Sequence, residues 1–242
     1  IRFYKNTSYG VVVVADVFAP KLEKHLSRKI KTPKKATEEP KEFDDVRLLV
    51  YTQPSKTGLP NKIPEIIELG IGGKNVQEKL NFAKTLMSKE LKASEILKEG
   101  QLVDTRSVSK GKGYQGPVKT HGVKIRQHKA EKTKRGPGSL GAWKAQGLIT
   151  YRVAHARKMG FHRRTDYNKL ILKISDKPET VNAKGGFLRF GLLKNEYMLV
   201  KGSVTGPAKR PIIFTETMRA PASHKVVTPK ITYISTESKQ RR

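Results

Sequence analysis

Positive charge is concentrated in the middle of this sequence, and this feature most restricts what the chain can fold into. The 242 residues include 50 Lys and Arg against 21 Asp and Glu, a formal net charge of +29. Residues 106–173 alone contain eighteen Lys and Arg and two acidic residues, Glu131 and Asp166, a net charge of +16. Such a field opposes compaction, and a polyanionic partner, above all nucleic acid, explains it most simply.

The rest of the composition describes a globular chain rather than a disordered tail. Hydrophobic residues make up 36%, which suffices for one sizeable core in one domain with a large insertion or in two small domains. The longest apolar run, residues 11–15, is far shorter than the roughly 20 residues that span a bilayer. The chain has no cysteine, which fits a reducing compartment, and it begins with Ile1 without a signal-peptide pattern, so we expect a fragment or a processed product.

Strand-like segments occur at both ends of the chain, and one helix is strongly indicated. Asn75 followed by Glu78 has the spacing of a capping box, and apolar residues continue at helical spacing to Leu91. A basic, helix-prone stretch also covers residues 21–35. Alternating and β-branched residues predict strands at residues 2–6, 11–14, 46–51, 102–108, 169–174, 187–190, 196–201 and 211–215.

The segment from residue 119 to residue 164 shows neither helical nor strand periodicity and is interrupted by glycines. It lacks the apolar residues that would let it fold on itself. We therefore expect it to be either disordered alone or shaped by the surface that it enters.

A G-x-G-x-x-G pattern lies within residues 109–116, SKGKGYQG, and could indicate a dinucleotide site. That site requires a helix that opens at the last glycine and an acidic residue about 20 positions later. Pro117 could begin a helix, but Gly122 follows without apolar periodicity, and no suitable acid is present. We expect no such helix and no cofactor; the glycines either bring backbone amides close to phosphates or merely permit a bend.

The histidines, the carboxylates and the single tryptophan are the other candidate site residues. His121 and His128, and His155 and His162, are each seven residues apart, but no cysteine and few acids accompany them, so we expect no metal site. No motif places a second catalytic group beside an acid, so we expect no enzyme. Trp143 lies among glycines and lysines rather than apolar residues, which favours stacking on RNA over a place in a local core.

Five segments, in this order, resemble the universal large-subunit ribosomal protein three family in its archaeal and eukaryotic branch. They are VDTRSVSKGKGYQGPVKTHGVK, GSLGAW, KMGFHRRTDYNKLILKI, GGFLRFG and YMLVKGSVTGPAKRP, with weaker similarity upstream in IRFYKNTSYG, FDDVRLLVYTQP and PEIIELGIGG. The resemblance covers nearly the whole chain.

The resemblance implies a mainly β fold with an α insertion, built on a β-barrel of the translation-protein type. The barrel would comprise residues 1–16, 101–118 and 166–222, with its first strands missing, and residues 17–100 would be the helical insertion. Residues 119–165 would form a long basic extension that penetrates ribosomal RNA, and residues 223–242 a basic tail.

The resemblance also implies a function. The family is a structural constituent of the large ribosomal subunit in the cytoplasm, binds 23S-type ribosomal RNA beside neighbouring ribosomal proteins, aids early assembly and supports the peptidyl transferase centre. It has no enzymatic activity, cofactor or small-molecule substrate. The residues expected to contact ribosomal RNA are Lys110, Lys112, Lys119, Lys124, Arg126, Lys129, Lys132, Lys134, Arg135, Trp143, Lys144, Arg152, Arg157, Lys158, His162, Arg163, Arg164 and Lys169.

The sequence departs from the family pattern at two places, and one alternative function is possible. The basic arm and first barrel strands that normally precede IRFYKN are absent, so either the chain is truncated or another polypeptide supplies them. At the expected tip of the extension, Gly141-Ala142-Trp143 is followed by Lys144-Ala145 instead of the family's His-Pro. The alternative function is a free RNA-binding chaperone or translational regulator that uses the same basic segment.

Overall fold

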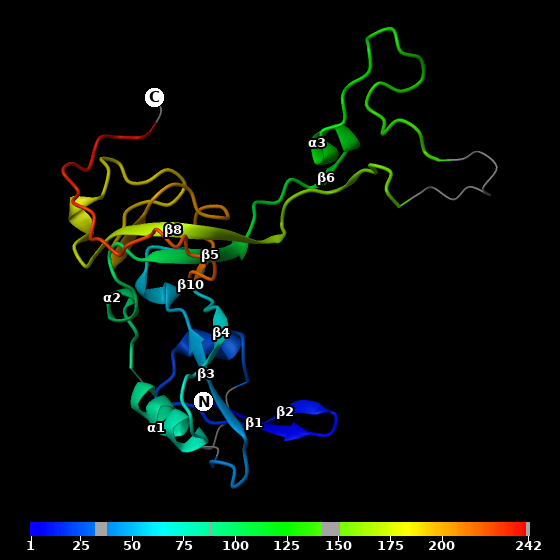
Figure 1. The fold of residues 1–242 in the computed structure, drawn as a ribbon. Coiled ribbons are helices and arrows are strands. Elements are labelled where there is room, and N and C mark those ends of the chain that lie inside the picture. The colour runs from blue at the N-terminus through cyan, green and yellow to red at the C-terminus, as the bar shows by residue number, and fades with distance from the viewer. Residues whose placement is uncertain (32–37, 88, 142–150, 241–242) are drawn as a thin grey trace. The chain divides into compact units, whose positions relative to one another are not determined.

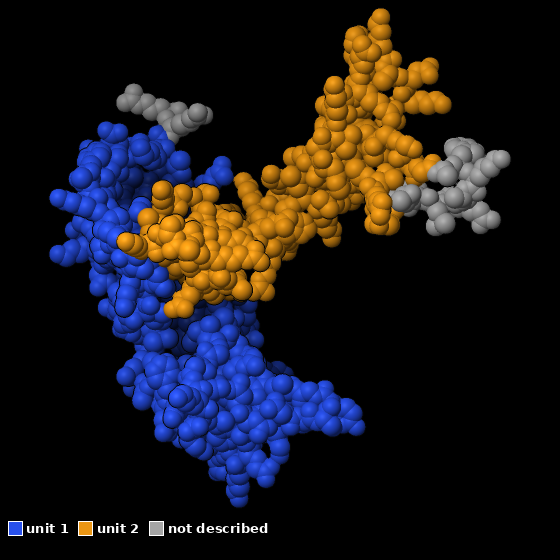
Figure 2. All heavy atoms as spheres, in the orientation of Figure 1, with its two compact units in different colours: residues 1–101, 171–200, 226–242 blue, residues 102–170, 201–225 orange. Residues whose placement is uncertain are grey.

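The computed structural model describes residues 1–31, 38–87, 89–141 and 151–240. These residues form mainly β-structure with few helices, which confirms the predicted fold class at this level (Figure 1). The chain divides into two compact units (Figure 2). Unit 1 contains residues 1–101, 171–200 and 226–242, and unit 2 contains residues 102–170 and 201–225.

Unit 1 contains an antiparallel sheet in the order β2-β1-β3-β4. Strands β1 (Arg2–Thr7) and β2 (Gly10–Asp16) form the predicted hairpin, and β1 also pairs with β3 (Asp45–Tyr51). Strand β4 (Ile66–Gly70) pairs with β3 and was not predicted.

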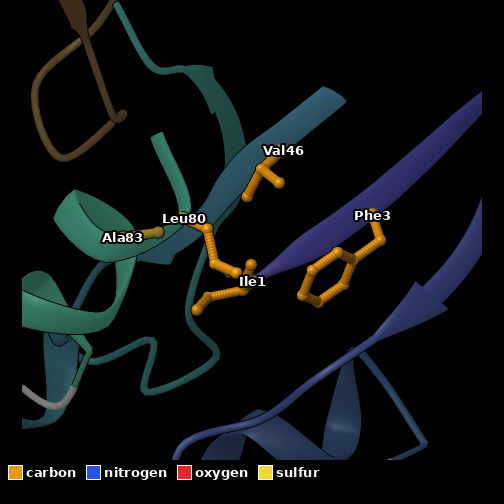
Figure 3. Close-up of a cluster of buried hydrophobic side chains, with 5 residues drawn as sticks. All are labelled: Ile1, Phe3, Val46, Leu80 and Ala83. Atoms are coloured by element: carbon orange, nitrogen blue, oxygen red, sulfur yellow. The ribbon is translucent and has the colours of Figure 1, made fainter. Parts of the chain in front are cut away.

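Figure 3 shows the core of unit 1, where Ile1 and Phe3 of the hairpin meet Val46 of β3 and two residues of helix α1 (Val76–Leu86). The predicted helix is confirmed at its start, since it begins at Val76. Two of the predicted apolar residues, Leu80 and Ala83, are buried. Burying the apolar stripe of an amphipathic helix supplies most of its stability in a protein, because propensity alone is marginal over eleven residues.

Three local predictions in unit 1 need correction. The Asn75 side chain caps no backbone amide; its Nδ2 lies 3.5 Å from Glu78 Oε1 instead. The helix ends at Leu86, so Leu91 lies beyond it and is exposed. The basic stretch at residues 21–35 forms only a 3-10 turn, η1 (Lys24–Arg28), within its described part, and a second turn, η2 (Pro54–Lys56), precedes β4.

Unit 2 is built around strand β5 (Leu102–Val108), whose residues are mostly buried. Antiparallel to it lie β10 (Ile213–Glu216) and the first part of β8 (Arg163–Ser175). The later residues of β8, from Ile171 onward, belong to unit 1 and pair there with β9 (Tyr197–Val200). Strand β8 begins six residues earlier than the predicted strand at 169–174, because its basic first residues pair with the end of β5.

The predicted strand at residues 187–190 is wrong. Residues 188–190 form a turn closed by two backbone hydrogen bonds between Phe187 and Gly191, at 2.9 and 3.0 Å. The cause is the backbone of Gly185, Gly186 and Arg189, which takes φ of 82°, 80° and 60°, because consecutive left-handed residues curl a chain that a strand would extend.

The remaining elements are short. Helix α2 (Ala93–Ile96) and turn η3 (Pro178–Thr180) belong to unit 1, while β6 (Tyr114–Gln115), α3 (Pro117–His121) and β7 (Arg157–Lys158) belong to unit 2. Residues 223–240 form no helix or strand. Within unit 1, Lys184 N donates to Thr236 O, and Gln240 Nε2 donates to the carbonyls of Gly185 and Gly186.

Candidate nucleic-acid interface

Two segments of opposite direction leave the sheet of unit 2 side by side and bring the predicted cationic residues together. After the last β5–β8 pair, Val108 with Arg163, Ser109 N donates to His162 O at 2.9 Å. Farther out, Lys112 N donates to Met159 O at 2.8 Å. Strands β6 and β7 then continue the pairing to the register of Gln115 with Arg157. The ladder therefore holds residues 109–115 and 157–162 in one two-stranded stem.

The stem is kinked at Gly160, where only glycine fits. Gly160 has φ of 73°, and a Cβ built on it would lie 2.1 Å from the carbonyl oxygen of Lys110. A steric clash with backbone at this distance cannot be relieved by rotating a side chain. The same kink places Phe161 at φ of 55°, a left-handed conformation that is rare for an aromatic residue.

An open pocket of about 560 Å³ lies at this kink. Six of its ten lining residues were predicted from the sequence, and none of the ten is acidic. Unpredicted contributors are Ser109, Thr120, Met159 and Gly160. The predicted ones are Lys110, Lys112, Arg157, Lys158, His162 and Arg164.

The other predicted residues lie outside this pocket. Lys119 is exposed on α3, and Arg163 is exposed at the start of β8. Lys169 is half-buried on β8, with its Nζ 3.8 Å from the Asp166 carboxylate. Trp143 and Lys144 lie outside the described residues. Exposed cations in segments without helix or strand are Lys124, Arg126, Lys129, Lys132, Lys134, Arg135 and Arg152.

Charge pairing differs sharply between the stem region and unit 1. Across the described residues from 110 to 164, no Lys or Arg forms an ion pair with a carboxylate. Among the described residues of unit 1, by contrast, eight cations are paired: Arg2, Lys5, Lys29, Arg47, Lys56, Lys79, Lys84 and Lys92. Unneutralised cations that converge on one surface create a field suited to an external polyanion.

Two further residues of this region, outside the pocket, were not predicted from the sequence. Arg210 Nη1 donates to the carbonyls of Val108 and Ser109, at 2.8 and 3.0 Å, and its guanidinium carbon lies 5.6 Å from the centre of the Phe161 ring. Phe161 is 69% exposed. The signal that drew attention to Trp143, an aromatic residue among glycines and cations, is also present at Phe161.

The glycine pattern that suggested a cofactor has a different use. Helix α3 does begin directly after Gly116, so the expectation that no helix opens there was wrong. Its five residues end at Gly122, which has φ of 69°. The first glycines serve the stem instead: Gly113 O accepts from Met159 N, and Gly111 lies against Phe161.

A metal site, a membrane-spanning helix and a second pocket are the other features that could indicate a function. No cluster of three His, Asp or Glu side chains suited to a metal ion occurs in the described parts of the chain. Nor does any helix in these parts have the length and hydrophobicity to cross a membrane. A pocket of about 680 Å³ in unit 1 is lined mainly by apolar side chains of η1, β3, β4 and the end of α1.

Comparison with known proteins agrees with the sequence motifs. The profile of the family described as ribosomal protein L3 matches residues 1–241. The large ribosomal subunit protein uL3 of Methanocaldococcus jannaschii is 44% identical over 251 residues, which cover 99% of this chain and 74% of that protein. The corresponding proteins of Methanobrevibacter smithii and Methanococcus aeolicus are 44% and 42% identical over 99% of this chain. The chain therefore belongs to the ribosomal protein L3 family.

Proposed function

We infer that this chain is a structural constituent of the large subunit of the cytoplasmic ribosome, where it binds ribosomal RNA and contacts neighbouring ribosomal proteins. It is a binding protein and not an enzyme. Family membership supports this function, and the observation that carries the RNA interface is the set of exposed, unpaired cations on the stem and beyond it. Phosphate contacts from Lys and Arg supply most of the affinity of such interfaces.

The proposal extends to the architecture. Residues 1–16, 101–118 and 166–222 belong to a β-barrel of the translation-protein type, and residues 17–100 are its insertion, which carries helices α1 and α2. Residues 119–165 form an extension that enters folded RNA, with Trp143 at its tip near the peptidyl transferase centre. The pairing of the stem supports this arrangement, because a two-stranded base fixes the direction in which an otherwise irregular segment leaves the sheet.

Sucrose-gradient sedimentation of extract from cells that carry a tagged chain tests the function. We expect the chain in every mature large subunit at a one-to-one ratio. A chain that is absent from mature subunits and sediments with precursors or free RNA would contradict the proposal and indicate a chaperone or regulator.

A matched pair of charge variants tests the interface. The triple change Lys110→Glu, Lys112→Glu and Arg164→Glu removes three cations of the pocket, and we expect it to prevent incorporation. The control, Lys41→Glu, Lys74→Glu and Lys98→Glu, makes the same change in net charge at exposed positions of unit 1. If both triple variants assembled equally well, the stem would not be the interface.

Salt dependence measures the phosphate contacts directly. If about eight cations contact phosphate, the logarithm of the association constant should fall with the logarithm of salt concentration with a slope of roughly −6, from about −0.7 per contact. The pocket triple variant should make this slope shallower by about 2, from three lost contacts. A wild-type slope shallower than about −2 would contradict a phosphate-dominated interface.

A further inference from the structure

The conformation of Phe161 is unfavourable for a residue whose only role is to fold. Its φ of 55° is a left-handed conformation, which costs about 1–2 kcal/mol for a residue with a Cβ. A buried ring could offset that cost by packing, but this ring is 69% exposed. Strained, exposed residues held by a rigid surrounding are concentrated at functional sites.

The surrounding of Phe161 is rigid on both sides. Its neighbour Gly160 lies against the carbonyl of Lys110, and a Cβ on Gly111 would lie 3.6 Å from the Phe161 Cβ. Ser109 and His162 are joined before the kink, through the bond from Ser109 N to His162 O and a second from His162 N to Ser109 Oγ at 3.2 Å. The crossing of the two segments therefore imposes the position of the aromatic residue.

A cation is fixed beside the exposed ring. The guanidinium of Arg210 is anchored by the carbonyls of Val108 and Ser109, and it lies 5.6 Å from the ring centre. Aromatic rings and guanidinium planes are the two side-chain surfaces on which unpaired RNA bases stack.

The cationic pocket is lined by residues that adjoin this pair. The two chain neighbours of Phe161, Gly160 and His162, both line it, together with Ser109, to whose carbonyl Arg210 donates. Phosphate bound among Lys110, Lys112 and Arg164 would thus be beside a base that stacks on Phe161. Asp and Glu side chains of an acidic peptide could satisfy the cations, but only a nucleotide joins an anion and an aromatic base in one unit.

We propose that the kink of the stem binds one unstacked nucleotide of an RNA strand. Its base stacks on Phe161 and Arg210, and its phosphate occupies the pocket lined by Lys110, Lys112 and Arg164. This inference rests on the proposed function, since it assumes that the chain binds ribosomal RNA. It adds that one binding determinant at this place is aromatic and not ionic.

The change Phe161→Gly separates this role from a structural one. Glycine adopts φ of 55° without cost, so the thermal midpoint of the free chain should stay constant or rise. Affinity for a large-subunit ribosomal RNA transcript should fall about 5- to 150-fold, the range that loss of one base stack predicts. The salt slope should stay unchanged because no phosphate contact is removed.

Two further variants and one crosslink complete the experiment. Phe161→Tyr should retain the affinity of the wild type, and Tyr9→Leu, at a fully exposed aromatic residue of unit 1, should not change it. With p-benzoyl-phenylalanine in place of Phe161 in assembled subunits, light should crosslink the chain to RNA.

The outcomes distinguish this inference from the proposed function. If the wild-type chain failed to bind the transcript, the proposed function would be wrong. If the wild type bound the transcript, any one of three results would show that the nucleotide site alone is wrong. These are equal affinity of Phe161→Gly, a lower thermal midpoint of Phe161→Gly, and a crosslink to protein instead of RNA.

Discussion

Asp104 of β5 should be the most sensitive polar residue of unit 2. Its side chain is fully buried, and it accepts three hydrogen bonds. Oδ1 accepts from Asn168 N and Thr217 Oγ1, each at 2.9 Å, and Oδ2 accepts from Met218 N at 3.0 Å. These bonds join β5 to an irregularity of β8, where Asn168 has φ of 57°, and to the segment after β10.

The expected loss of stability follows from the groups that are left without partners. Asp104→Ala leaves the amides of Asn168 and Met218 without an acceptor, at about 1–3 kcal/mol each. The hydroxyl of Thr217 can turn its single proton to Asn168 Oδ1, which lies 2.5 Å away. We expect a loss of about 2–6 kcal/mol from the free energy of unfolding. Asp104→Asn keeps one acceptor oxygen and should cost about 1–3 kcal/mol.

Acid titration provides a second measurement. Burial by itself would raise the pKa of Asp104, but the hydrogen bonds from Asn168, Met218 and Thr217 outweigh it and hold the pKa below its ordinary value. The lowered pKa stabilises the fold fully above the unfolded value, about 3.9, and this contribution is lost as pH falls further. Asp104→Asn should therefore lose less stability than the wild type between about pH 5 and pH 2.

Urea denaturation followed by circular dichroism, with hydrogen exchange at β5, measures these effects. The control is Asp166→Ala on β8, a partly exposed acid whose ion pair with Lys169 should contribute less than about 1 kcal/mol. Equal losses for Asp104→Ala and Asp166→Ala, or parallel acid titrations of Asp104→Asn and wild type, would refute the assignment.

Three further predictions concern other parts of the chain. Gly160→Ala should lower stability and RNA affinity together, because its Cβ meets the Lys110 carbonyl, whereas Gly122→Ala, with φ of 69° but nothing within 4 Å, should cost only about 1–2 kcal/mol; equal unfolding midpoints would show that the contact at the kink is unimportant. Val11→Lys on edge strand β2, in a hairpin whose residues 7–15 carry no charge, should reduce aggregation of the free chain in light-scattering assays with little change in stability, and unchanged scattering would contradict this. Trp143→Ala should permit assembly but alter peptidyl transfer or the sensitivity of ribosomes to drugs that bind the peptidyl transferase centre. Wild-type behaviour in both assays would exclude a role at that centre.

Several elements could be predicted because their signal is local. The hairpin follows from two strand-forming runs around a glycine turn, and helix α1 follows from the spacing of apolar residues that begins at Val76. Strand β4 could not be predicted, because its five residues form a strand only through pairing with β3. The early start of β8 has the same cause: its basic first residues resemble the neighbouring irregular segment, and β5 extends them.

The sequence by itself determined that the chain binds a polyanion and to which family it belongs. Net charge is a sum over residues, and the motifs and their order are read directly from the sequence, so neither depends on the fold. Only the tertiary structure decided which cations converge and that Phe161 meets Arg210, 49 positions away along the chain. Sheet register and the left-handed backbone at Gly160 and Phe161 produce that meeting, and both depend on contacts between distant segments that no local pattern encodes.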